Sequence, residues 1–203
     1  MKIPSKHLEN AVDQLGSLPG IGRRTALRLS LHLLKKNENE LLDFTQAITD
    51  LKSKLFSCTS CGNISDETVC SICINPNRDH KTICVVEDIR DVMAIESTSA
   101  YKGIYHVLGA LISPLDGIGP QDLNIESLIQ KVEKNQLTEI IFALSPTMEG
   151  DTTNFYLFKK IQQFSPYVTA LSRGVAVGSE LQYTDELTLG RSLQQRQEFK
   201  LNS

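Results

Sequence analysis

Two Cys-x-x-Cys pairs, Cys58/Cys61 and Cys70/Cys73, constrain the fold of this chain more than any other feature of its sequence. Two residues between paired cysteines let the chain turn back so that both sulfurs reach one ion, and two such pairs complete a tetrahedral set. A disulfide or a redox pair is the alternative, but the sequence has no secretory signature. The spacing therefore predicts a zinc finger with four cysteine ligands. Because four sulfurs leave no open coordination position, the zinc ion should be structural.

The composition indicates a globular protein of several small domains. The chain has 203 residues, and the hydrophobic fraction of 40% is enough to build a core. Its first residues, MKIPSKHLEN, lack the apolar segment of a signal peptide, and no apolar run approaches the roughly 18 residues of a membrane span. We therefore expect a cytoplasmic protein. The fifth cysteine, Cys84, lies in the apolar run ICVV and is expected to be a buried thiol without chemistry.

Charge is distributed unevenly along the chain. Residues 1–36 carry seven basic and two acidic side chains, a net charge of +5, whereas the whole chain has a net charge of -3. The remaining residues therefore carry about -8. This asymmetry indicates an end that binds a polyanion and an acidic body, although a solvated charged face is the alternative.

The first 56 residues predict three amphipathic helices. Ser5 is placed to cap the first, the second runs from about 23 to 36, and the third from about 39 to 56. His32 is expected to pack among the leucines of the second helix. The apolar stripe of the third helix either closes a small helical domain or joins another subunit. The stripes of the second and third helices are Ala26, Leu27, Leu31, Leu34 and Leu41, Phe44, Ile48, Leu51, Leu55.

The segment LPGIGRR connects the first two helices and is a candidate anion-binding site. Gly20 and Gly22 allow a tight hairpin that leaves backbone N–H groups exposed at the start of the next helix, where an anion can bind. Arg23, Arg24 and Arg28 follow at once and add charge-assisted contacts. The stretch resembles the helix-hairpin-helix motif, which grips the phosphate backbone without reading bases. The alternative is an ordinary glycine-containing connection with arginines in solvent.

From Thr82 onward the pattern alternates between strand and helix, which predicts a largely parallel sheet covered on both faces. The carboxyl ends of such strands meet at one edge. Glu87 follows the first strand, and Glu149 and Asp151 lie in the segment PTMEGDTTN after the third, which we expect to be a loop. The tail begins with a turn at Gly174 and Gly178 and ends in a helix at about 185–196.

This arrangement of acids resembles the Toprim domain, whose carboxylates hold Mg²⁺ for phosphodiester chemistry. The second element here is Glu149-Gly150-Asp151 instead of the usual Asp-x-Asp, which weakens the prediction of Mg²⁺ binding and argues against catalysis. Glu87 and Asp88 have a second explanation as acids that favour the N-terminus of a helix. We therefore consider Glu87, Glu149 and Asp151 a candidate site for Mg²⁺ or for a partner protein.

Taken together, the motifs resemble the bacterial RecR family of recombination mediators along essentially the whole chain. The resemblance implies four parts: a helix-hairpin-helix DNA-binding domain at 1–54, a four-cysteine zinc finger at 55–79, a Toprim domain at 80–175 and a Walker-B-like segment with a helix at 176–203. The matching stretches are LPGIGRRTALRLSLHLL, the finger, VVEDIRDVMAIEST, HVLGALISPLDGIGPQDLNIESL, SPTMEGDTTNFYL and VGSELQYTDELTLGRSLQQR.

The resemblance further implies a non-enzymatic function in recombinational DNA repair. A family member is expected to close into a homotetrameric ring, or to form a dimer, and to act as a clamp on DNA. With RecO and RecF it would help to load RecA on gapped or single-stranded DNA. The alternative function is that of a Mg²⁺-dependent Toprim nuclease or a primase-like enzyme.

Overall fold

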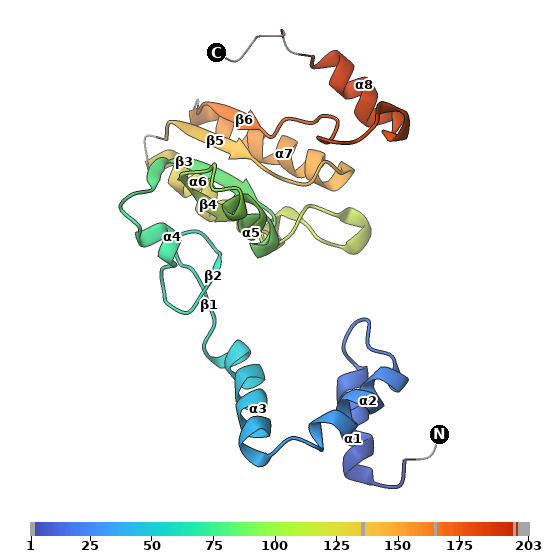
Figure 1. The fold of residues 1–203 in the computed structure, drawn as a ribbon. Helices are drawn as coiled ribbons and strands as arrows, with labels where there is room; N and C mark the ends of the chain where they lie inside the picture. The colour runs from blue at the N-terminus through green and yellow to red at the C-terminus, as the bar shows by residue number, and fades with distance from the viewer. Residues whose placement is uncertain (1–2, 135–136, 165, 197, 199–203) are drawn as a thin grey trace. The chain divides into compact units, whose positions relative to one another are not determined.

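A computed structural model describes residues 3–134, 137–164, 166–196 and 198, and the chain divides into two units, residues 1–55 and 56–203 (Figure 1). The first unit is helical, and the second contains the cysteine finger and a parallel α/β domain. The predicted fold class, multidomain α and α/β, is therefore confirmed. No helix in these residues is long and apolar enough to cross a membrane.

The first unit contains α1 (Lys6–Gly16), α2 (Arg23–Leu33) and α3 (Glu38–Ser53). As predicted, the Ser5 hydroxyl caps α1, where it accepts a hydrogen bond from the Leu8 amide at 3.4 Å. Helices α1 and α2 pack against each other and bury Val12 and Ala26. This packing makes the hairpin between the two helices a defined element.

The outer half of α2 differs from the prediction. The helix ends at Leu33 instead of Lys36, Leu34 is 75% exposed, and Leu31 is also exposed. Ser30 is buried instead, because its hydroxyl donates a hydrogen bond of 2.9 Å to the carbonyl oxygen of Ala26 and needs no solvent. The apolar stripe expected on α2 is therefore wrong beyond Leu27.

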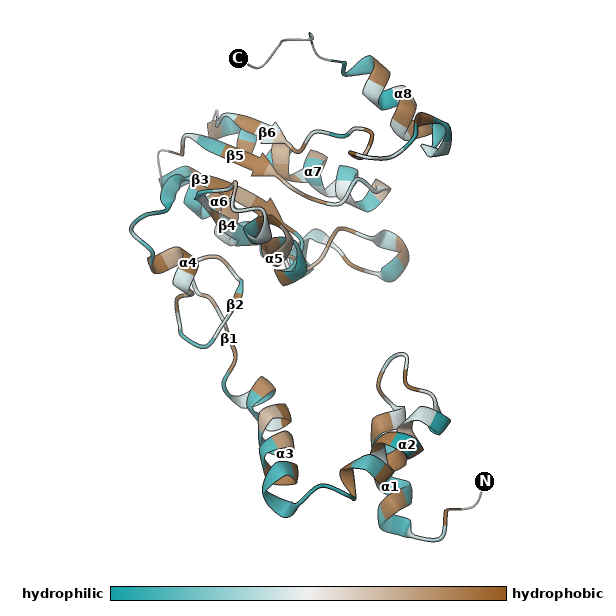
Figure 2. Cartoon of the chain, viewed as in Figure 1, coloured by the Kyte–Doolittle hydropathy of each residue, from teal (hydrophilic) through white to brown (hydrophobic). Residues whose placement is uncertain are grey.

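Helix α3 begins at a capping box in which the Asn37 side chain accepts from the Glu40 amide and the Glu40 carboxylate accepts from the Asn37 amide. None of its residues is buried in the single chain. Hydrophobic residues recur along the helix (Figure 2), and all five of the predicted stripe are exposed: Leu41, Phe44, Ile48, Leu51 and Leu55.

The second unit begins with a small antiparallel hairpin of β1 (Phe56–Ser57) and β2 (Ile64–Ser65), followed by α4 (Ser71–Ile74). A parallel four-stranded sheet follows, with the strand order β4-β3-β5-β6. Its strands are β3 (Asp79–Val86), β4 (Gly103–Val107), β5 (Glu139–Phe142) and β6 (Val168–Ala170). The segment NPNRDHKT at 75–82, whose polar composition predicts a connection, already contains the first residues of β3.

Helices cover both faces of this sheet, as predicted (Figure 1). Alternate side chains of β3 divide between two cores. Ile83 and Val85 pack with residues of α6 (Ile125–Lys134) and α7 (Met148–Ile161), whereas Cys84 and Val86 pack with Val92 of α5 (Ile89–Ser97). Cys84 is buried as expected, and this burial raises the pKa of its thiol to about 12. The segments at 114–116, 120–122, 162–164 and 181–183 form short 3-10 turns.

Two segments near the carboxyl ends of the strands complete the unit. Helix α7 starts at Met148, capped by the Thr147 hydroxyl, so Glu149 and Asp151 lie in its first turn and not in a loop as predicted. The tail forms α8 (Glu186–Gln194), capped by Asp185, close to the predicted helix.

Candidate metal centre and nucleic-acid interface

The four predicted zinc ligands converge on one point. The Sγ atoms of Cys58, Cys61, Cys70 and Cys73 all lie within 4.8 Å of one another, and the first three of these residues are buried. They carry free thiols, so a disulfide does not explain their proximity. Among the residues described by the structure, they are the group of three or more His, Cys, Asp and Glu side chains that can hold a metal ion. Four soft sulfur donors fit a structural ion such as zinc.

The backbone around the cysteines is folded to favour thiolates. The Cys70 amide points at the Sγ atom of Cys58 at 3.2 Å, and the Asn63 amide points at that of Cys61 at 3.4 Å. Hydrogen bonds of this kind stabilise the charged form of sulfur. The hydrogen bond between Cys61 and Cys73 lowers the pKa of Cys73 to about 5 and raises that of Cys61, so this arrangement favours a thiolate at Cys73.

Gly62 closes the first knuckle in a conformation that other residues rarely adopt, with a φ of 78°. A Cβ atom at this position would lie 2.9 Å from the Val107 carbonyl oxygen and 2.9 Å from the Asn124 amide nitrogen. The glycine therefore serves both the turn and the close approach of the knuckle to β4.

The hairpin between α1 and α2 has the geometry expected of an anion site. Gly20 has a φ of 78°, which allows the tight turn, and the Ile21 amide donates to the Leu18 carbonyl oxygen at 3.1 Å. Gly22 is the N-cap of α2 but has an ordinary extended conformation, and a Cβ atom there would meet no described atom within 4 Å. None of the described side chains caps this helix end. The glycine therefore leaves space directly in front of the first amides of α2.

Basic side chains of α2, and of Lys35 just after its end, line a hollow of about 450 Å³. Arg24 and Arg28 are one turn apart, and His32 and Lys35 continue the same row. His32 is exposed here, so the expectation that it packs in the core is wrong. Sequence reasoning missed His32 and Lys35 as members of this basic row, although their spacing of four and three residues from their predecessors was a usable signal.

Arg23 differs from the other two arginines because it already has acidic partners within the hairpin. Its guanidinium lies 2.8 Å from a carboxylate oxygen of Asp13 and 3.5 Å from one of Glu9. The three side chains are about half exposed, so the ion pairs are weak and a phosphate can compete for the arginine. The geometry nevertheless favours Arg24 and Arg28 as the principal contacts.

The predicted Toprim acids occupy separate environments at the carboxyl ends of β3 and β5. Glu87 follows β3 and is partly buried, and this burial together with the nearby Asp91 and Asp88 carboxylates raises the pKa of Glu87. Asp88 caps α5, and Asp91 accepts hydrogen bonds from the Glu87 and Asp88 amides at 3.1 and 3.2 Å. This is the helix-initiating role that was the alternative explanation for Asp88.

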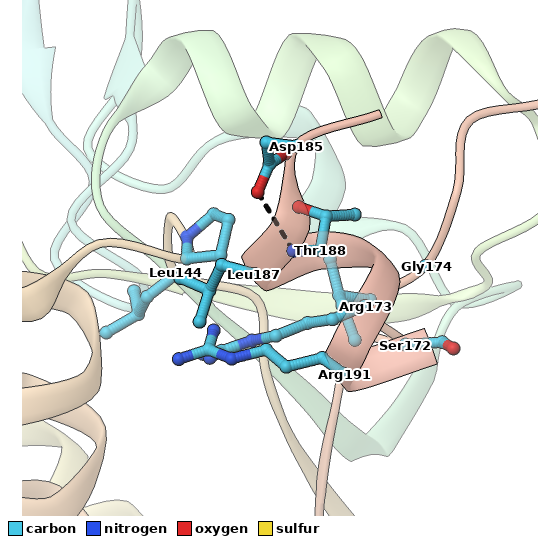
Figure 3. A pocket seen from close by; sticks show the side chains of 10 residues that line it. Leu144, Ser172, Arg173, Gly174, Asp185, Leu187, Thr188 and Arg191 are labelled. Carbon is cyan, nitrogen blue, oxygen red and sulfur yellow. Dashed lines mark hydrogen bonds between the residues drawn. The ribbon is translucent and has the colours of Figure 1, made fainter. Parts of the chain in front are cut away.

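Asp151 is held by arginines from the tail. Both of its carboxylate oxygens accept hydrogen bonds from Arg173, which lowers the pKa of Asp151, and Arg191 lies 3.8 Å away. The two arginines line a pocket of about 440 Å³, and Figure 3 shows their side chains extending into it in the same direction. Within the described residues, Glu87, Glu149 and Asp151 form no metal-ligating group. Their binding of Mg²⁺ stays a prediction.

A helix-hairpin-helix end, a four-cysteine finger and a parallel α/β domain in one chain define a modular protein of nucleic-acid metabolism. Three family models match: "Toprim domain" at residues 81–170, "RecR, helix-hairpin-helix" at 8–52 and "RecR, C-terminal" at 174–197. The chain also resembles curated proteins called "Recombination protein RecR" along nearly its full length, and it belongs to the RecR family.

Three of these relatives illustrate the similarity. The protein of Porphyromonas gingivalis is 54% identical over 98% of this chain and 96% of its own length. That of Flavobacterium johnsoniae is 55% identical over 98% and 97%, and that of Amoebophilus asiaticus is 56% identical over 97% and 98%. The match therefore covers every part of the architecture described above.

Proposed function

We propose that this chain is a DNA-binding recombination mediator of the cytoplasm that acts as a ring-shaped clamp in recombinational DNA repair. With RecO and RecF it helps to load RecA on gapped or single-stranded DNA, and it performs no bond chemistry. The observation that carries this proposal is the basic face of α2, with Arg24 and Arg28 beside the open N-terminus at Gly22. Such a surface meets phosphates and reads no bases.

A sequence-independent grip suits a mediator, because the place where it must work is defined by DNA structure and not by sequence. Backbone amides at the start of α2 offer fixed dipoles to a phosphate, and Arg24 and Arg28 add charge on the same side of the helix. Gly20, Gly22, Arg23, Arg24 and Arg28 are therefore our proposed DNA-binding residues.

The proposed homotetramer would use apolar surface that the single chain leaves uncovered. Helix α3 exposes Phe44, Ile48 and Leu51 on one face by 41, 56 and 60%, and none of its residues is buried. A contiguous exposed apolar face marks an interaction surface. Ile48→Glu should lower the molecular mass measured by light scattering, whereas Lys52→Glu on the same helix should not. An unchanged mass in the Ile48 variant would remove α3 from the subunit interface.

Arg173 and Arg191 support the absence of bond chemistry. A guanidinium that donates to both oxygens of a carboxylate occupies part of its lone pairs and places a positive charge beside it, so Mg²⁺ binds there less favourably. Asp151 is the Toprim acid concerned. The alternative function, a Mg²⁺-dependent nuclease or primase-like enzyme, would need Glu87 and Asp151 to act on one ion.

The salt dependence of DNA binding tests the interface. Replacing Arg24 and Arg28 by Gln should flatten the log-log salt slope for duplex DNA by about 1.8, since each neutralised phosphate contributes about 0.9. Adding Arg23→Gln should flatten it by less than a further 0.9 or so, because Asp13 and Glu9 already engage this arginine. Lys52→Gln with Lys54→Gln is the charge-matched control on α3 and its C-cap. An unchanged slope in the arginine variants would overturn the assignment.

A second experiment separates a clamp from a nuclease. The zinc-loaded protein is incubated with supercoiled and gapped circular DNA, with and without Mg²⁺, and both retention on DNA and strand breaks are measured. A clamp is retained and leaves every strand intact. Mg²⁺-dependent nicking that disappears in Glu87→Gln would replace this proposal with the nuclease alternative.

A further inference from the structure

A second basic hollow lies in the α/β unit, beside the first cysteine knuckle. Its volume is about 560 Å³. Ser60 comes from the knuckle, His80 and Lys81 from the first residues of β3, and Lys131 and Lys134 from the last turns of α6. Four groups that carry or can carry positive charge therefore face one cavity from two separate elements.

Among the described residues, the lining contains no carboxylate, and the negative charge that acts on Lys131 comes from the cysteine cluster behind it. The nearby Asp79 is occupied at the start of β3, where its two oxygens accept from the Lys81 amide at 2.9 Å and from the Thr82 hydroxyl at 2.6 Å. Lysines in the last turn of α6 also complement the dipole of that helix. This simpler explanation covers Lys131 and Lys134, but it gives no reason for Lys81 to face the same cavity from β3.

Lys131 is held in position by a chain of hydrogen bonds through the buried side chain of His106. The ring of His106 is fully buried, and its Nε2 atom lies 2.7 Å from the Asn124 carbonyl oxygen. Because that oxygen can only accept, Nε2 carries the hydrogen and Nδ1 is left to accept from the Lys131 ammonium group at 3.1 Å. One N–H of Lys131 is thus fixed on the protein. The ammonium group is pre-organised at the edge of the cavity.

The residues that line the hollow indicate which kind of ligand it can bind. Three apolar side chains belong to the lining: Ile83 and Ile104 are nearly fully buried, 1% and 7% exposed, and Leu137 is partly buried. The other lining groups are ammonium groups, an imidazole and the Ser60 hydroxyl, which match the oxygens of phosphate.

We propose that this hollow binds the phosphate backbone of DNA as a second contact, separate from the helix-hairpin-helix. This inference rests on the proposed DNA-binding function and extends it to the α/β unit. Lysines present point charges without a fixed hydrogen-bonding fork, so the contact tolerates any sequence and a flexible single strand.

The test is the salt dependence of binding to a single-stranded oligonucleotide. Lys81 and Lys134 are both exposed, so Lys81→Gln with Lys134→Gln should leave the fold intact. The log-log salt slope should flatten by about 1.4, at about 0.7 for each phosphate that is no longer neutralised on a single strand. Lys81→Arg with Lys134→Arg should keep the original slope. The matched control is Lys159→Gln with Lys160→Gln, two exposed lysines of α7 that do not line the hollow.

The arginine variants of α2, measured in the same experiment, distinguish failure of the second contact from failure of the proposed DNA-binding function. A flattened slope in the α2 variants with no change in the Lys81/Lys134 variant would overturn the second contact and leave the proposed function standing. No change in either set would overturn both. Equal flattening in the Lys159/Lys160 control would also overturn the second contact, since general charge would then explain the effect. Binding of a poly-glutamate peptide that depends on Lys81 and Lys134, without any change in DNA slope, would reassign the hollow to an acidic protein partner.

Discussion

The backbone amide of Val107 donates a hydrogen bond of 2.8 Å to the carbonyl oxygen of Cys61. This bond joins the second cysteine of the metal cluster to the last residue of β4, an edge strand of the parallel sheet. Gly62 allows the approach, because any side chain there would strike the Val107 carbonyl oxygen. The finger is therefore fastened to the sheet, and loss of the metal should be felt beyond the finger itself.

Cys58→Ser should lower the stability of the protein more than it lowers DNA affinity per folded molecule. Removing one ligand of a structural site weakens metal binding that contributes directly to folding. A loss of about 3 kcal/mol corresponds to a fall in Tm of roughly 6–12 °C for a chain of this size. Calorimetry and metal content measure the first effect, and DNA titration of the folded fraction measures the second. A metal-free variant that melts like the parent protein would contradict the structural role.

The appropriate control for that experiment is Cys84→Ala. Cys84 is also a buried cysteine, but it belongs to the core on one face of the sheet and not to the metal cluster. The variant should lose some stability through the cavity it creates, while its metal content stays equal to that of the parent protein.

Local patterns in the sequence predicted those parts of the protein whose cause is local. The Cys58 to Cys73 spacing, the Ser5 cap and the alternation of strand and helix each depend on residues close together in the chain, and the structure has all three. The pairing of Asp151 with Arg173 and Arg191 depends on residues 22 and 40 positions apart. No sequence pattern links residues at these separations, so the ion pairs of Asp151 could not be predicted.

The sequence also predicted incorrectly which side chains of α2 are buried. Ser30 is buried in α2 because its hydroxyl bonds to the helix backbone, which an apolar stripe does not anticipate. Leu34 and the α3 leucines are exposed in the single chain, although the pattern marks them as apolar positions. Periodicity identifies an apolar face but not the surface that covers it.

Gly150→Ala should be strongly destabilising, whereas Gly190→Ala should not. A Cβ atom at Gly150 would lie 1.9 Å from the Ser145 carbonyl oxygen, so the backbone must shift at a cost of about 1–3 kcal/mol or more. At Gly190, inside α8, a Cβ atom meets no described atom within 4 Å, and alanine should gain about 0.5–1 kcal/mol from helix propensity. Urea unfolding measures both. Equal stability of the two variants would contradict the close approach at the start of α7. This contact also explains why a glycine separates Glu149 from Asp151.

His106 should make the protein less stable as the pH falls below about 6.5. Burial and the Lys131 charge lower the pKa of this histidine from its ordinary 6.5 to about 3. Between these values the unfolded chain binds a proton that the folded chain does not, so the contribution is fully present above about pH 6.5 and is lost on acidification. The slope is about 1.4 kcal/mol per pH unit. Urea unfolding at about pH 7, 6 and 5.5 measures it across this range.

The control for this pH dependence must separate His106 from metal loss, because thiolates are protonated in acid as well. Metal content is measured at each pH, and only samples that retain the ion are compared. His106→Gln should show a shallower pH dependence than the parent protein, while His80→Gln, at an exposed position, should follow the parent. Parallel curves for the parent and the His106 variant would contradict the prediction.

Gly22→Ala should impair DNA binding without unfolding the hairpin. The backbone conformation at Gly22, with φ of -74° and ψ of 157°, is open to alanine, and the added Cβ atom meets no described protein atom within 4 Å. Stability should therefore change by less than about 1 kcal/mol, the range of N-cap substitutions. The same methyl group would occupy the space through which a phosphate reaches the first amides of α2. Losing one hydrogen bond to a charged group costs about 1.5–3 kcal/mol, so affinity should fall roughly tenfold or more.

Fluorescence anisotropy with labelled DNA measures this loss, and Gly190→Ala is the control. Unchanged affinity in the Gly22 variant would mean that the helix end does not approach DNA, and the interface would then consist of the Arg24 and Arg28 face alone.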